Sequence, residues 1–338
     1  MMLAVRSPRA RVGSAGIALV AVIALSGCQA GSPAASPTTA VAETPTQPST
    51  QTPDPTRTVP EPPVAGGCGG IFSDVEVGRI TAGATVIEPD ELWDVAIETI
   101  GGLSCSFRSD SMAGEVIMLP AAWAADLEQG GPEEQFGTPG CERDYGDVVC
   151  SASEVAGGTW VLVTMPRAGE DVPGELPEVQ AAVLRAMATV VRGSVPAGVN
   201  TRAATLDCPE LAERISVAGL LGGGEIFPTR IEEGQGPLER RIADATGASV
   251  RCDWSELDNF RELGVVRIPG GAWAWDRVVE QAAGSRDVDI AGITARLWPK
   301  PSGETGILIG DDRDLVWVWG RDIGDTDLMS AATAVVGG

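Results

Sequence analysis

The sequence contains no histidine and a single lysine, Lys300, so two common catalytic side chains are missing or nearly so. Without histidine, a Ser-His-Asp triad, a Cys-His pair and a histidine-bound metal are excluded. The sequence also lacks a phosphate-binding loop, a dinucleotide fingerprint and a Gly-x-Ser-x-Gly motif. We therefore expect a non-enzymatic protein without a cofactor. A hydrolase built on two carboxylates stays open, because 47 acidic residues make some pair unavoidable.

Positive charge is also scarce. The chain carries 24 basic and 47 acidic residues, which gives a formal net charge of −23. Such an excess of negative charge opposes binding to nucleic acid and to anionic lipid surfaces. We therefore expect no nucleic-acid partner.

The N-terminus has the layout of a signal peptide. Arg6, Arg9 and Arg11 precede an apolar run over residues 16–25. A spanning helix needs roughly 20 apolar residues, so this run is too short to cross a membrane and fits a signal peptide. We expect residues 1–27 to be removed on export.

The run ends in Leu25-Ser26-Gly27-Cys28, which resembles the lipobox of bacterial lipoproteins. The resemblance implies a lipid on Cys28, cleavage before that residue, and a protein held at the extracytoplasmic face of the cell membrane. A plain signal peptide ending by chance at a cysteine is the alternative. Residues 28–67 are rich in Pro, Thr and Ser and lack apolar periodicity, which predicts a disordered tether or an inert spacer.

The rest of the chain repeats one pattern, in residues 68–197 and again in 203–338. Each copy opens on a helix that begins at a cysteine, continues through a second helix that stops at glycine, and enters a Cys-x-aromatic strand. A strand ended by proline, a Trp-bearing helix, a hairpin and a closing helix follow. The fold class predicted is α+β: two tandem αα-ββ-α-ββ-α modules, each with a mostly antiparallel sheet and helices on one side.

The repeat also predicts the disulfides. Equivalent cysteines in two copies are expected to pair equivalently, giving Cys68–Cys105 and Cys208–Cys252. Cys141 and Cys150 remain and are expected to close a local loop in the first copy. No C-x-x-C pair is present, so a metal site is not expected.

Two features suggest binding groups. Nine tryptophans accompany one tyrosine. Most fall on apolar faces, but Trp273 and Trp319 alternate with other tryptophans that cannot all point inward. These two and Trp298 are the candidate binding residues, and core or edge packing is the preferred alternative. Asp311, Asp312 and Asp314 suggest calcium, yet a hairpin turn is the preferred interpretation.

The lipobox, the tether and the Cys-x-Trp modules together resemble the envelope lipoproteins of actinobacteria. The resemblance implies an envelope role and no defined reaction. The main hypothesis is a non-catalytic lipoprotein whose modules bind a partner protein or an envelope glycan or lipid. The alternative is the solute-binding lipoprotein of a transporter, which a cavity between two large lobes would favour.

The anchor is directly testable. Cys28→Ala is expected to abolish acylation and to leave the precursor uncleaved, because both steps need the thiol-bearing residue. Metabolic labelling with a clickable palmitate analogue measures the first and gel mobility the second. Label persisting on the variant would contradict the anchor.

Overall fold

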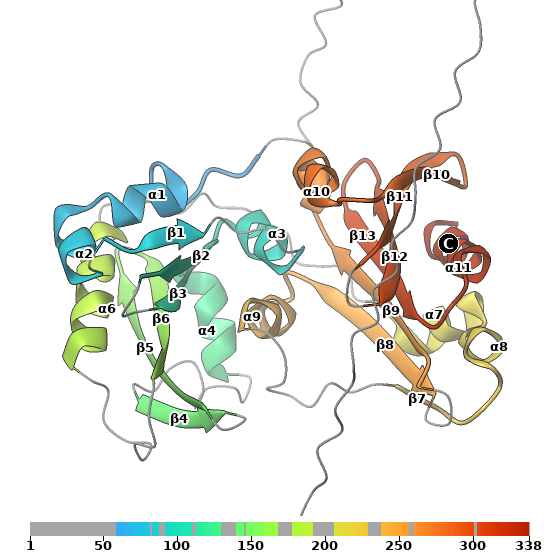
Figure 1. The fold of residues 1–338 in the computed structure, drawn as a ribbon, viewed down its shortest axis with the longest axis horizontal. Helices are drawn as coiled ribbons and strands as arrows, with labels where there is room; N and C mark the ends of the chain where they lie inside the picture. The colour runs from blue at the N-terminus through green and yellow to red at the C-terminus, as the bar shows by residue number, and fades with distance from the viewer. Residues whose placement is uncertain are drawn as a thin grey trace, which may run out of the picture. The chain divides into compact units, whose positions relative to one another are not determined.

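A computed structural model describes residues 59–81, 83–87, 92–109, 113–129, 140–144, 147–167, 178–191, 206–228, 238–256, 260–300 and 303–337 (Figure 1). The predicted signal peptide, Cys28 and most of the predicted tether lie outside them, as does the predicted module boundary at residues 197–203. Among the described residues, no helix combines the length and the apolar character that a membrane span requires.

The N-terminal half, residues 59–191, builds one antiparallel sheet in the order β1-β2-β3-β6-β5-β4. Its strands are β1 (Thr85–Ile87), β2 (Leu103–Arg108), β3 (Ala113–Pro120), β4 (Gly140–Asp144), β5 (Asp147–Ala156) and β6 (Thr159–Arg167). Its helices are α1 (Gly67–Phe72), α2 (Val75–Ile80), α3 (Leu92–Thr99), α4 (Ala121–Gln129) and α6 (Glu178–Val191).

The C-terminal half, residues 206–337, builds a second antiparallel sheet in the order β10-β11-β12-β13-β9-β8-β7. Its strands are β7 (Ile226–Pro228), β8 (Val250–Glu256), β9 (Glu262–Ile268), β10 (Arg286–Ile290), β11 (Ile293–Pro299), β12 (Glu304–Gly310) and β13 (Leu315–Arg321). Its helices are α7 (Cys208–Ile215), α8 (Val217–Leu221), α9 (Leu238–Thr246), the 3-10 helix η2 (Gly271–Ala274), α10 (Trp275–Gln281) and α11 (Asp325–Val336). The α+β class with two antiparallel sheets is therefore confirmed.

Helices cover both faces of the first sheet, so the prediction that they lie on one side was wrong. Along β3, Val116 and Met118 pack with α1, α2 and α6, whereas Ile117 and Leu119 pack with α3 and α4. Alternate residues of a strand point to opposite faces, so a strand that is buried on both sides needs two helical layers. The run Val116-Ile117-Met118-Leu119 is apolar without interruption, which is the sequence sign of such a strand.

The structure contains all three predicted disulfides: Cys68–Cys105, Cys141–Cys150 and Cys208–Cys252. The two long bridges join α1 to β2 and α7 to β8. The short bridge joins residues that face each other across β4 and β5. It therefore links two strands of the sheet, where the sequence predicted only a closed loop.

The predicted opening helix of the first copy is interrupted. A single helix from Cys68 would bury Val75, seven residues later on the same face, but Val75 is 87% exposed. The Asp74 carboxylate accepts hydrogen bonds from the backbone N–H groups of Glu76 and Val77, at 2.9 and 3.1 Å, and so caps a new helix, α2. Val77 takes the buried position instead.

Short elements were missed for related reasons. β1 and β7 have three residues each, too few to show alternation. The hairpin β10–β11 turns at Ala291 and Gly292, both with positive φ, without the Asn-Gly signal that predicts such turns. In the Gly-rich stretch 220–227, residues 220–221 end α8 and residues 226–227 begin β7.

The predicted tether also ends earlier than residue 67. Pro63 and Val64 are buried, and Val64 packs in the core formed by α1, α2 and α6. The backbone N–H of Gly67 donates to the carbonyl of Val64 at 3.0 Å. The folded part therefore begins at or before Pro63.

The bridges are expected to differ in their effect on stability. Cys208 and Cys252 are 44 residues apart and Cys141 and Cys150 are 9 apart. In the chain-entropy model, the paired change Cys208→Ala with Cys252→Ala lowers the free energy of unfolding by about 4 kcal/mol, and removal of the short bridge lowers it by nearer 3 kcal/mol. Urea denaturation under non-reducing conditions measures both, and a larger loss from the short bridge would contradict this account.

Candidate functional site

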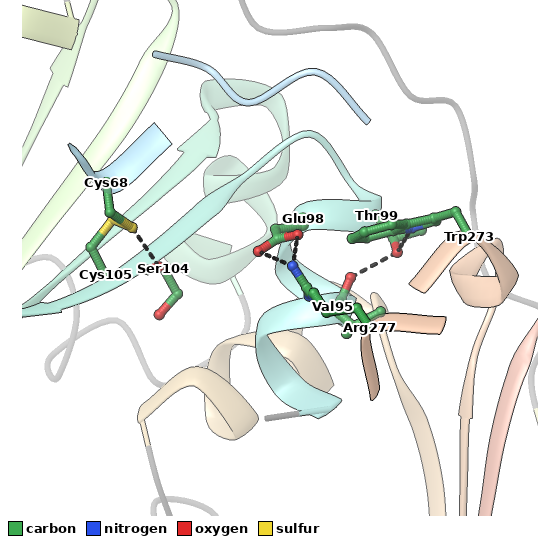
Figure 2. A network of polar contacts seen from close by, with 8 residues as sticks. All are labelled: Cys68, Val95, Glu98, Thr99, Ser104, Cys105, Trp273 and Arg277. Atoms are coloured by element: carbon green, nitrogen blue, oxygen red, sulfur yellow. Dashed lines mark hydrogen bonds and ion pairs between the residues drawn. A yellow bond between two sulfur atoms is a disulfide. The ribbon is translucent and has the colours of Figure 1, made fainter. Parts of the chain in front are cut away.

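Trp273, the first candidate binding residue, lies against the N-terminal half of the chain (Figure 2). Its indole Nε1–H donates to the Thr99 hydroxyl at 3.0 Å, and that hydroxyl donates in turn to the carbonyl of Val95 at 2.7 Å. The Arg277 guanidinium lies 5.0 Å from the Trp273 ring centroid and donates to both oxygens of Glu98, at 3.1 and 2.8 Å. The Trp273 side chain therefore makes its contacts inside the protein, between α3 and the η2–α10 segment.

This contact belongs to a continuous apolar core. One cluster of buried residues contains Val95 and Ile97 of α3, Ile242 and Ala243 of α9, and strand residues from both sheets. Helix α3 packs against α9 and η2, and α4 also packs against α9. The apolar core therefore includes residues of both halves of the described chain.

A charged cluster lies at the margin of that core. Trp93 of α3 has the guanidinium groups of Arg240 and Arg251 near its ring, with carbon-to-centroid distances of 5.7 and 6.0 Å. Arg251 Nε lies 2.7 Å from the Asp253 carboxylate, and Asp253 is 9% exposed. Burial raises the pKa of Asp253 to about 6, although Arg251 and Arg240 oppose that rise. Burial, with a contribution from Arg251, lowers the pKa of Arg240.

Trp298 and Trp319, the other two candidates, lie on one face of the second sheet. The strand register sets Trp298 opposite Gly306, Gly306 opposite Trp319, and Trp319 opposite Gly264, with Asp253 next in the row. Residues paired across antiparallel strands share a face. Both tryptophans are half-buried. We call this cross-strand row, Asp253–Gly264–Trp319–Gly306–Trp298, the tryptophan row.

Glycine makes room for the indole rings. A Cβ atom on Gly264 would overlap the Trp319 ring at Nε1, and a Cβ on Gly306 would overlap the six-membered ring of Trp317. The rings therefore lie directly against the backbone of β9 and β12. Trp317 is 4% exposed and meets Trp298 edge to face, with ring centroids 5.7 Å apart.

Charged side chains border the tryptophan row. The Arg321 guanidinium contacts the carboxylates of Glu262 and Glu304, each at 2.9 Å. The ammonium group of Lys300 lies 5.0 Å from the Trp298 ring centroid and 5.3 Å from that of Trp317. Lys300 is the single lysine of the chain. Aromatic, cationic and carboxylate groups thus gather on one face of the second sheet.

The structure therefore brings Trp298 and Trp319 into one cross-strand row and places Trp273 at the contact between α3 and η2–α10, and all three pack against the shared apolar cluster. Sequence reasoning missed Lys300 and Arg321, whose positions beside the rings depend on strand register. It also missed the partner glycines, although Gly264 and Gly306 each stand inside a strand, where glycine marks a close approach.

The aspartates of residues 311–314 form the predicted hairpin turn. The Asp311 carboxylate accepts hydrogen bonds from the backbone N–H groups of Arg313 and Asp314. Asp314 accepts from the backbone N–H of Gly270 at 2.9 Å and pairs with Arg267. Within the described ranges, no group of three or more acidic or cysteine side chains is arranged to hold a metal.

A hollow of about 390 Å³ opens between α7, α11 and the second sheet. Its lining combines apolar side chains, among them Val265, Ile309 and Val316, with acidic residues and with Arg214 and Arg267. Its lining contains no aromatic side chain, so the tryptophan row is the better candidate site. Comparison with known protein families, curated proteins and solved structures finds no match.

The buried carboxyl gives a pH signature. Between the ordinary carboxyl pKa of 3.8 and about 6, native Asp253 keeps a proton that the unfolded chain releases, so its contribution to stability falls as pH rises through that window. Asp253→Asn, which mimics the protonated form, escapes this loss. Its stability relative to the original chain is expected to rise by about 2 kcal/mol between pH 4 and pH 7.

Urea denaturation across that range measures the difference, with Asp276→Asn on the exposed side of α10 as the matched control. A difference between the Asp253 variant and the original chain that stays constant with pH would contradict the assignment.

Proposed function

We propose that the chain is a non-catalytic lipoprotein of the bacterial cell envelope, held to the membrane by a lipid on Cys28. A disordered tether connects the anchor to two related modules, of which the second binds an envelope component through the tryptophan row. The anchor rests on the Leu25-Ser26-Gly27-Cys28 motif. The other parts rest on the following observations.

The matching strand orders support descent of the two halves from one duplicated module. Read from β1 and from β7, the orders β1-β2-β3-β6-β5-β4 and β7-β8-β9-β13-β12-β11 correspond strand by strand, and β10 is an addition at the far edge. The Cys68–Cys105 and Cys208–Cys252 bridges occupy equivalent places between the opening helix and the second strand.

The packing of the two halves supports the same proposal. Under this correspondence α3 is equivalent to α9, and α4 to the η2–α10 segment. Helix α3 of the first half contacts η2 of the second, and α9 of the second half contacts α4 of the first, so the same pair of elements meets in both directions. The two equivalent helices, α3 and α9, also contact each other. Such reciprocity is what a two-fold dimer of identical modules produces.

One observation carries the assignment of binding to the second module. In the first sheet, the cross-strand row that starts at the residue after the disulfide cysteine Cys105 consists of Ser106, Glu115, Thr164, Ser151 and Gly140. The equivalent row of the second sheet is the tryptophan row. Trp319 stands where the first module has Thr164, and Gly264 beneath its ring stands where the first has Glu115. Tryptophan and the glycine that accommodates it occur together in the second module alone, which favours a specialised face there.

The alternative function, solute binding for a transporter, needs a space between two lobes. In this chain α3, α9 and η2 meet through buried apolar side chains, among them Val95, Ile97 and Ile242. This packing favours the envelope-binding proposal over the transporter proposal.

Photo-crosslinking in intact cells tests the proposal. A photoreactive amino acid at position 298 is expected to yield an adduct with an envelope component, and Trp319→Thr, which restores the residue of the first module, is expected to lower the yield at least fivefold. Val155, 55% exposed on the first sheet, is the control position. Equal adducts from positions 298 and 155, or none from 298, would contradict binding by the second module.

A further inference from the structure

We infer that the ligand of the tryptophan row is a neutral oligosaccharide of the envelope; this inference rests on the proposed function. The row combines aromatic rings, polar groups held in fixed positions and balanced charge, and each of these features narrows the class of ligand.

The rings supply flat apolar contact. The half-buried Trp319 ring lies against Gly264 and so rests on the sheet, and the half-buried Trp298 ring packs against the buried Trp317. Trp298 meets Trp317 at an interplanar angle of 65° and so stands away from the plane of that ring. The aliphatic C–H face of a pyranose ring packs on such a surface through dispersion, and it presents hydroxyl groups around its edge.

The spacing suits a chain of sugars. Trp298 lies on β11 and Trp319 on β13, with β12 between them. Two steps between neighbouring strands separate their backbones by about 10 Å, which is on the order of two linked pyranose rings. A single monosaccharide would reach one of these tryptophans only.

The polar border suits hydroxyl groups. The Arg321 guanidinium bridges Glu262 and Glu304, so donors and acceptors stand side by side in fixed positions. Lys300 adds an ammonium group beside Trp298. Adjacent hydroxyls of a sugar both donate and accept hydrogen bonds, so they can use both kinds of group.

The balance of charge argues for a neutral ligand. Lys300 and Arg321 offset Glu262 and Glu304 around the rings, and Arg251 pairs with Asp253 at the end of the row. The chain as a whole carries −23. The locally balanced row offers neither a cationic peptide nor an anionic polymer an excess of opposite charge to pair with, and the overall charge also repels an anionic polymer.

Titration calorimetry on the full chain carrying Cys28→Ser tests the inference. The neutral probes are cellohexaose, chitohexaose and maltohexaose; the charged probes are oligogalacturonate and an oligolysine peptide. We expect at least one neutral hexasaccharide to bind, with an affinity that changes less than twofold between 50 and 500 mM NaCl, because exposed charge–charge attraction is screened by salt.

Trp298→Gly and Trp319→Thr, which install the residues of the first module, are expected to weaken that binding at least tenfold. Trp123→Thr, at a half-buried tryptophan of α4, is the matched control and is expected to leave binding within twofold. Thermal unfolding of each variant shows that the fold is kept. If a row variant unfolds, Lys300→Met and Arg321→Gln take its place, with an expected loss of at least threefold.

Binding of a charged probe alone would overturn the inference. If no hexasaccharide binds but position 298 yields a protein adduct in cells, the inference of a glycan ligand is wrong and the proposed function is still supported. Failure of every probe and of the crosslink would overturn both.

Discussion

The apolar contact between α3 and α9 is the interaction on which the rest of the structure depends. Each sheet has one face covered by its own helices, α1, α2 and α6 in the N-terminal half and α7, α8 and α11 in the C-terminal half. The opposite faces, with Ile117 on one sheet and Val266 on the other, contribute to a single cluster with α3, α4, α9 and η2. Removing either half would return that apolar surface to water, at roughly 25 cal/mol for each Å² exposed.

This contact also explains where polar groups are tolerated. At its margin Asp253, Arg251 and Arg240 are partly or fully withdrawn from water. The pKa of Asp253 is raised because burial disfavours its charged form. The Trp273 indole and the Glu98–Arg277 pair satisfy donors and acceptors there, so they serve the packing of the chain. The tryptophan row continues from Asp253 across the same face of the second sheet, toward β11. Helices α9 and α10 pack on this same face, and the tryptophan row adds two half-buried rings, Trp298 and Trp319, to it.

Much of this arrangement was readable from the sequence where a residue's role depends on near neighbours. The cysteine pairings followed from the repeated Cys-x-aromatic strand. Of the five tryptophans whose surroundings predict core packing, Trp160, Trp254 and Trp317 are buried, whereas Trp123 and Trp275 are half-buried. The second helical layer was missed, although β3 is apolar at four consecutive positions. The role of Trp273 depends on Thr99, 174 residues away. The pairing of Trp319 with Gly264 depends on the register of β9 and β13, which a single sequence does not specify.

The central claim is that the two halves share one core, and their unfolding tests it most directly. Pulse-labelling hydrogen exchange along a urea titration reports on peptides of β3 in the first sheet and β9 in the second. The shared cluster around Val95, Ile97 and Ile242 predicts one midpoint for both strands, because neither half keeps its second core without the other. Two separate midpoints, with one sheet protected after the other has opened, would contradict the claim.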